Sequence, residues 1–261
     1  HTPQKTTYFD SCHREEMSLV ARMPELPLSH IWVASQIAPK LPQGCVLHLG
    51  ILSPLRSWSY FEIDRSIEVE CNQGGFGIDG NLSTLIGASL VQPEKIHFAV
   101  VGDLSFFYDM NSLGNRHVGK NVRILLINNS LGAEFILFKQ LNSTYVRNVE
   151  DFIAAEGHFG HKSPNSVRDY ATNLGYDYLS AWSKEEFADN YERFISPEPN
   201  DKPMVFEVFT ASEDENEALK RMWNIEKTPT SIKHEAKEAI KNVIGKENAK
   251  KFKEIVKILK K

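Results

Sequence analysis

The sequence predicts an α/β fold, a doubly wound and mainly parallel sheet of about six strands. Short β-rich segments alternate along the chain with segments of helical periodicity, which is typical of such sheets. The strand segments are apolar on both faces, as in Phe-Ala-Val-Val at 98–101 and Ile-Leu-Leu-Ile at 124–127. Strands of this kind belong to parallel sheets covered by helices. We therefore expect a ligand site beyond the carboxyl ends of the strands.

The expected elements follow in chain order. The strands are predicted at 45–49, 67–71, 96–101, 123–127, 176–180 and 204–209. The helices are predicted between them, at 29–39, 80–90, 105–116, 163–174, 184–195 and 213–223. Residues 1–27 lack sustained periodicity and contain Pro3, Pro24 and Pro27, so they are expected to form a linker or extended lead-in. Residues 28–223 then make up the folded domain.

A Lys-rich tail is expected at residues 224–261, with helices at 233–245 and 248–260. The tail holds 11 Lys against 5 Glu, while the whole chain carries a net charge of −4. We interpret the tail as solvated amphipathic helices, because a nucleic-acid or lipid contact would need a denser basic cluster. The composition therefore favours neither nucleic acid nor a membrane surface as a partner.

The cellular location follows from segments that the sequence lacks. No apolar run approaches the roughly 18 residues of a membrane span, and no signal-peptide pattern opens the chain. Cys12, Cys45 and Cys71 are odd in number and widely spaced, which indicates reduced thiols. These features predict a cytoplasmic protein.

Polar residues follow two consecutive predicted strands, and they carry the chemistry. Gly102 and Asp103 end one strand, and Asn128 and Asn129 end the next, 26 residues after Asp103. One βα unit separates them, so both side chains reach the same edge of the sheet. A carboxylate and an amide oxygen, with a backbone carbonyl and phosphate oxygens, suit octahedral Mg²⁺.

The residues after the first of these strands also suit a diphosphate. The backbone amides of Gly102, Leu104 and Ser105 lie at a predicted helix N-terminus, where anions bind. Gly102 has no side chain, so the backbone can approach a phosphate closely. Taken singly, Asp103 would more often be a helix cap and Asn129 a turn residue. Their spacing favours the binding site.

A dinucleotide site is the main alternative. Gly75, Gly77 and Gly80 form a GxGxxG pattern that follows a predicted strand and opens a helix. Asp79 would then sit in the glycine turn, where its carboxylate would repel a pyrophosphate. The dinucleotide interpretation also leaves the Asn pair at the second strand end without a role.

The paired motif resembles the diphosphate-binding motif of thiamine-diphosphate-dependent enzymes. The sequence is most similar to the SEPHCHC synthase family of menaquinone biosynthesis, in the motif stretches Gly77-Ile78-Asp79-Gly80, Ser83-Thr84 and Gly102-Asp103-Leu104-Ser105. The similarity runs over about residues 50–135, and the fold pattern continues to about 209. It implies the C-terminal diphosphate-binding domain, with the thiamine-diphosphate-binding fold, of a 2-oxo-acid decarboxylase or carboligase. In that family a 2-oxoglutarate-derived unit is joined to isochorismate.

The resemblance also implies roles for single residues. Asp103, Asn129 and the main-chain oxygen of Leu131 would hold Mg²⁺, and Ile78 would support the bent cofactor. The cofactor would also contact Gly102, Leu104, Ser105 and Gly132.

Two further positions concern the substrate. Arg56 matches an arginine that binds a substrate carboxylate, a task suited to its fixed fork of donors. Gln73 stands where the family has a substrate-binding arginine, and Ile51-Leu52 stand where it has Asn-Ser. The resemblance therefore supports the cofactor site more strongly than the substrate.

In this family a glutamate that activates the cofactor comes from a pyrimidine-binding domain, contributed across a homodimer or by another subunit. No such domain precedes residue 1 in the given sequence, so we expect the isolated chain to bind cofactor but to be catalytically incomplete. A non-catalytic cofactor-binding or scaffolding domain that uses its tail for a partner is the alternative.

Overall fold

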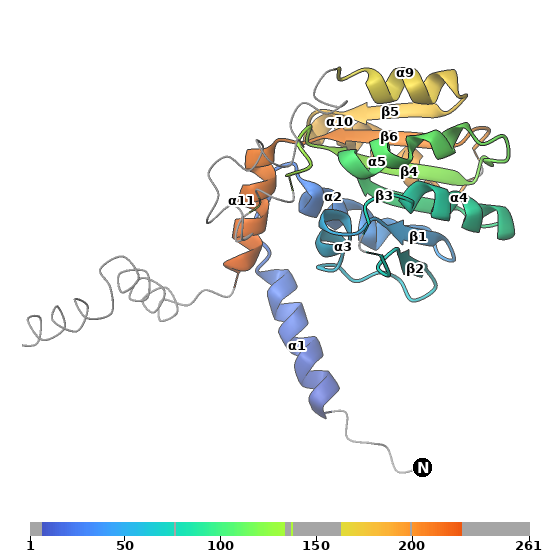
Figure 1. Cartoon of the computed structure of the whole chain (residues 1–261). Helices are drawn as coiled ribbons and strands as arrows, with labels where there is room; N and C mark the ends of the chain where they lie inside the picture. Colours follow the sequence, from blue (N-terminus) through green and yellow to red (C-terminus); the bar gives the residue numbers. More distant parts are fainter. Residues whose placement is uncertain (1–6, 76, 134–136, 138–162, 199, 226–261) are drawn as a thin grey trace, which may run out of the picture. The chain divides into compact units, whose positions relative to one another are not determined.

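The computed structural model describes residues 7–75, 77–133, 137, 163–198 and 200–225. Two compact units divide the chain: residues 25–220, and the two ends, residues 1–24 with 221–261 (Figure 1). The sheet and the candidate site belong to the first unit. The tail helices expected at 233–245 and 248–260 lie outside the described residues.

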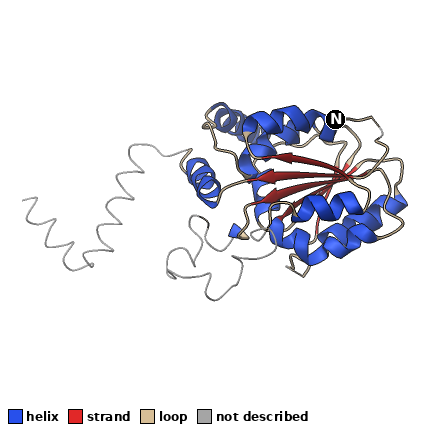
Figure 2. Ribbon diagram, turned by 90° about the horizontal axis from the view of Figure 1, so that it is seen from above, coloured by secondary structure: helices blue, strands red, loops and turns tan. Residues whose placement is uncertain are grey.

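A parallel sheet of six strands, in the order β2-β1-β3-β4-β6-β5, forms the centre of the first unit. Figure 2 shows helices on both sides of it. The doubly wound α/β prediction is confirmed, and each predicted strand agrees with the structure to within one residue. The strands are β1 (Val46–Leu49), β2 (Glu68–Cys71), β3 (His97–Gly102), β4 (Val122–Asn128), β5 (Asp177–Ala181) and β6 (Met204–Phe209).

Two apolar clusters fill the space between the sheet and its helices. One lies under α2 (His30–Ile37), α3 (Ser53–Trp58) and α10 (Lys184–Ile195). The other lies under α4 (Asn81–Val91), α5 (Asp103–Asp109) and α9 (Ser166–Asn173). Alternate residues of β4 enter the two clusters, Leu125 the first and Leu126 the second. This explains why the central strands are apolar on both faces.

Several helices begin and end where the sequence indicates. Ser29 caps α2 by accepting the Trp32 N–H, and Ser183 caps α10 by accepting the Glu186 N–H. Two predicted helices end in 3₁₀ turns, η1 (Ala38–Lys40) after α2 and η2 (Met110–Gly114) after α5. The helix predicted at 213–223 is α11 (Ser212–Trp223).

The extended lead-in predicted for residues 1–27 is wrong over most of its length, because Thr7–Ala21 form helix α1. This helix buries none of its residues. Within the described residues, no helix is both long enough and apolar enough to span a membrane. Cys12, Cys45 and Cys71 are all free thiols, as predicted.

Candidate ligand site at the carboxyl edge of the sheet

The order of the strands creates a crevice at one end of the sheet. From β1 the chain passes outward to β2 and then returns to β3 on the other side of β1, so the loops after β1 and β3 diverge. A cavity of about 410 Å³ opens at this point. It is lined by His30 and by residues from four segments that follow strands or begin helices, within 51–54, 77–79, 102–105 and 129–133. This volume is in the range of small-molecule sites.

Asp103 is the buried carboxylate of the cavity. Its side chain is 4% exposed, and Oδ1 accepts the Leu104 N–H at 2.7 Å. Its Oδ2 atom is buried without a hydrogen-bond partner among the described residues. Burial raises the pKa of Asp103, while N–H groups of Leu104, Gly132 and the adjoining turn lower it. A buried oxygen in this position calls for a cation or a donor from a ligand.

The turn after β4 brings Asn129 to the same cavity. Asn129 Oδ1 accepts the N–H groups of Leu131 at 3.2 Å and Ala133 at 3.3 Å. Ser130 and Gly132 take positive φ values of 66° and 58°. Asn129 therefore shapes the turn as well as facing the cavity beside Asp103.

Ile78 lines the cavity from the loop before α4. Its carbonyl accepts hydrogen bonds from Ser105 Oγ at 2.6 Å and Asn81 Nδ2 at 2.9 Å. Asn81 Nδ2 also donates to Ser105 Oγ at 2.9 Å. Because Ser105 belongs to α5 and Asn81 to α4, both helix starts hold this loop in place.

The loop after β1 closes another side of the cavity and carries backbone strain. Leu52 has φ 72°, a conformation that is costly for a residue with a side chain. Gly50 precedes it, and a Cβ atom there would lie 3.0 Å from the Val100 carbonyl oxygen. Both residues let the chain turn sharply from β1 into α3.

The structure gathers most, but not all, of the predicted site residues. The cavity is lined by the predicted positions Ile78, Gly102, Asp103, Leu104, Ser105, Asn129 and Gly132. Leu131 lies in the same turn but is not among the lining residues, and neither are Arg56 on α3 and the exposed Gln73. Their roles stay predictions. The described residues hold no cluster of three or more His, Cys, Asp or Glu that could bind a metal, so a cation here would need amide and carbonyl oxygens in addition to the Asp103 carboxylate.

Three buried polar residues near this edge were not predicted. His30 lines the cavity, and burial lowers its pKa to about 3, so its ring is neutral. Both carboxylate oxygens of Glu215 accept a hydrogen bond from the His30 backbone N–H at 3.1 Å, and one of them also accepts from the Thr210 hydroxyl at 2.8 Å. Burial raises the pKa of Glu215 to about 7. Glu207 lies in β6, where a charged residue inside an apolar strand is a signal that could have identified it.

The GxGxxG segment has a different environment from a dinucleotide site. It follows β2, and the helix after it is α4. Ser83, in the first turn of α4, donates its N–H to Asp109 Oδ2 at 2.7 Å and its hydroxyl to the same oxygen at 3.0 Å. A carboxylate of the chain thus occupies the place that a pyrophosphate would need. This geometry disfavours the dinucleotide interpretation.

Fold and cavity together give a doubly wound α/β protein with a candidate ligand site at the switch point of the sheet. No family model matches the sequence. The chain is, however, similar to proteins named 2-succinyl-5-enolpyruvyl-6-hydroxy-3-cyclohexene-1-carboxylate (SEPHCHC) synthase. It is 36% identical to the one from Phocaeicola vulgatus over 202 residues, 77% of this chain and 35% of that protein. The resemblance to the SEPHCHC synthases is thereby confirmed.

Two further relatives bear the same name. The protein from Bacteroides fragilis is 36% identical over 197 residues, 76% of this chain and 34% of the relative. The protein from Christiangramia forsetii is 34% identical over 206 residues, 79% of this chain and 34% of the relative. The chain therefore spans about a third of the length of the curated relatives it matches.

Proposed function

We propose that residues 28–223 are the thiamine-diphosphate- and Mg²⁺-binding domain of a 2-oxo-acid decarboxylase or carboligase of the SEPHCHC synthase kind. The observation that carries the proposal is the buried Oδ2 atom of Asp103, which has no hydrogen-bond partner among the described residues, while Asp103 and Asn129 both line the cavity at the switch point of the sheet. The similarity to SEPHCHC synthases over three quarters of the chain supports it independently.

In this proposal Asp103, Asn129 and the main-chain oxygen of Leu131 hold Mg²⁺, which neutralises the diphosphate. A phosphate can approach the backbone at Gly102 closely, since nothing lies within 4 Å of a Cβ built there. Ile78 supports the cofactor from the loop that Ser105 and Asn81 hold. When bound, thiamine diphosphate supplies an electron sink for cleavage and bond formation beside a 2-oxo group.

The substrate and the partner are finer parts of the proposal. Arg56 binds a carboxylate of a small 2-oxo acid, and Gln73 offers a neutral hydrogen bond where the family has a cation. A pyrimidine-binding domain, in a homodimer or on another subunit, supplies the activating glutamate. The protein acts in the cytoplasm with its thiols reduced.

Isothermal titration of thiamine diphosphate into the purified chain, with and without Mg²⁺, tests the proposal. We expect binding that requires Mg²⁺ and is lost in Asp103→Ala. Asp201→Ala is the matched control, because Asp201 is an exposed carboxylate just before β6, at the opposite edge of the sheet. A heat of binding with NAD and none with thiamine diphosphate would overturn the proposal. Binding of thiamine diphosphate that Asp103→Ala leaves unchanged would overturn it as well.

A further inference from the structure

Three polar side chains form a row on one face of the sheet, across adjacent strands. Asn128 ends β4, Glu207 lies in β6 and Tyr178 lies in β5. Leu126, two residues before Asn128, and Val205, two residues before Glu207, belong to the cluster under α4, α5 and α9. Because side chains alternate along a strand, Asn128 and Glu207 share that face. The row begins beside the metal-binding turn proposed above, residues 129–132.

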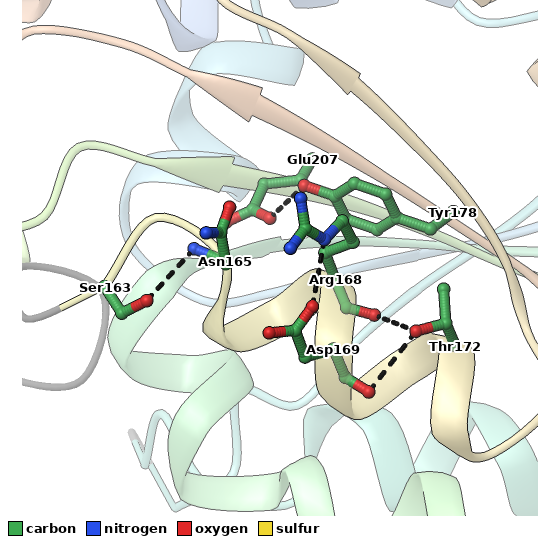
Figure 3. Close-up of polar contacts among 7 residues, drawn as sticks. All are labelled: Ser163, Asn165, Arg168, Asp169, Thr172, Tyr178 and Glu207. Carbon is green, nitrogen blue, oxygen red and sulfur yellow. Dashed lines mark hydrogen bonds and ion pairs between the residues drawn. The ribbon is translucent and has the colours of Figure 1, made fainter.

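Glu207 is the centre of the row. Its side chain is 1% exposed, and its two oxygens accept separate hydrogen bonds, Oε1 from Asn128 Nδ2 at 2.7 Å and Oε2 from the Tyr178 hydroxyl at 2.7 Å. Figure 3 shows the second of these bonds. Burial raises the pKa of Tyr178, so its hydroxyl remains protonated and donates. Unlike Asp103, this carboxylate uses both of its oxygens within the chain.

The bond to Glu207 decides how the Asn128 amide is turned. With Nδ2 directed at the carboxylate, Oδ1 faces the opposite way and accepts the Ser130 N–H at 3.0 Å. Ser130 is the residue held at φ 66°, in the left-handed region that a side chain disfavours. The Asn128 carbonyl is fixed separately, by the Thr210 N–H at 3.0 Å. Glu207 is thus linked through one side chain to the strained residue of the turn.

A buried carboxylate in the middle of a strand is expensive to desolvate, and an apolar residue would pack there without that penalty. We propose that Glu207 is a positioning residue, which holds the metal-binding turn through Asn128 so that Asn129 faces Asp103 before the cation arrives. The inference rests on the proposed function. Groups that orient metal ligands in this way typically change metal affinity by about 10–100-fold when removed.

Amide hydrogen exchange and cofactor titration on the whole chain test the proposal. In Glu207→Leu we expect faster exchange at Ser130 and Leu131 without ligand, and Mg²⁺-dependent affinity for thiamine diphosphate about tenfold weaker or more. Glu207→Gln keeps an acceptor for Asn128, so we expect affinity within about threefold of wild type. Asn128→Ala removes the same link from the other side and should reproduce the loss, even if Glu207→Leu folds poorly.

Tyr178→Phe is the matched control, since it removes the other hydrogen bond of Glu207 and leaves Asn128 in place. We expect wild-type affinity and wild-type exchange in the turn for this variant. If wild type binds and the Glu207→Leu and Asn128→Ala variants bind equally well, the positioning role is overturned while the proposed function stands. Absence of binding to wild type refutes the proposed function, and the positioning role with it.

Discussion

At the scale of single residues, three buried carboxylates near the carboxyl edge of the sheet differ in how they are satisfied. Glu207 and Glu215 accept hydrogen bonds on both oxygens from the chain itself. Asp103 has one oxygen without a partner among the described residues. Desolvation raises the pKa of all three. The carboxylate with the unused oxygen is the one that a cation would stabilise, which is why we propose the metal site at Asp103.

The raised pKa of Glu215 predicts a pH dependence of stability. Burial lifts it from an ordinary 4.5 to about 7, so the folded chain favours the protonated acid. The stabilisation that protonated Glu215 gives to the fold is therefore fully present below about pH 4.5 and is lost as the pH rises through about 7. Glu215→Gln, which resembles the protonated acid, should remove this loss. We expect urea unfolding at pH 5 and pH 8 to show that the free energy of unfolding falls by about 2 kcal/mol more in wild type than in the variant between these two pH values.

Glu213→Gln serves as the control for this measurement. Glu213 is an exposed carboxylate on the same helix, and we expect its variant to follow the wild-type pH dependence. Equal losses in wild type and Glu215→Gln would show that Glu215 does not titrate between these pH values.

The residues that could be predicted share one property, since their signals are local in the sequence. Gly102 with Asp103, and Asn128 with Asn129, are short motifs at strand ends. His30 and Glu215 meet across 185 residues of chain, and neither forms a motif with its neighbours. Their partnership depends on how α2 and α11 pack, which periodicity alone does not determine.

At the scale of elements, the central strands β1, β3, β4 and β6 were predicted well because each is short, largely apolar and buried along its length. The missed helices lack such a signal. In α3, Ser53–Trp58 make only six residues, too few to show a helical period. In α1, the apolar residues Tyr8, Phe9, Met17 and Val20 are exposed, and the helix buries no residue.

Two glycines in neighbouring elements should respond oppositely to replacement by alanine. Gly50→Ala places a Cβ 3.0 Å from the Val100 carbonyl oxygen, and we expect a loss of about 1–3 kcal/mol in the free energy of unfolding. Gly87 is exposed within α4, with nothing within 4 Å of a built Cβ. Gly87→Ala should stabilise the chain by about 0.5–1 kcal/mol. Chemical denaturation measures both changes, and a stable Gly50→Ala would contradict the close approach.

Arg123 connects β4 to the end of α10. Its side chain is 1% exposed and donates to the carbonyls of Phe194, Ser196 and Glu198. Arg123→Met leaves these acceptors unpaired, so we expect the free energy of unfolding to fall by about 3 kcal/mol. Arg123→Lys keeps the charge but not the planar set of donors, so we expect its free energy of unfolding to fall less. Cofactor titration is the control, because Arg123 lies at the start of β4, away from the cavity. Unchanged unfolding of Arg123→Met would refute this role.

At the scale of the whole molecule, the proposed function requires a second protein part. In the proposed function the residues lining the cavity hold a metal and a diphosphate, and the chain spans about a third of the length of its curated relatives. The proposed activity also needs a glutamate at the pyrimidine end of the cofactor. No described residue lining the cavity is a glutamate, since Glu207 and Glu215 are not among the lining residues.

We therefore expect the isolated 261-residue chain to bind Mg²⁺ and thiamine diphosphate and to release no carbon dioxide from 2-oxoglutarate. Adding the part of the Phocaeicola vulgatus relative that lies outside the matched region, as a fusion, should restore release of carbon dioxide. A fusion carrying Asp103→Ala is the control and should stay inactive. Release by the isolated chain would refute its incompleteness. A fusion that binds cofactor and remains inactive would favour a non-catalytic cofactor-binding domain, because the missing part would then be present and the chemistry still absent.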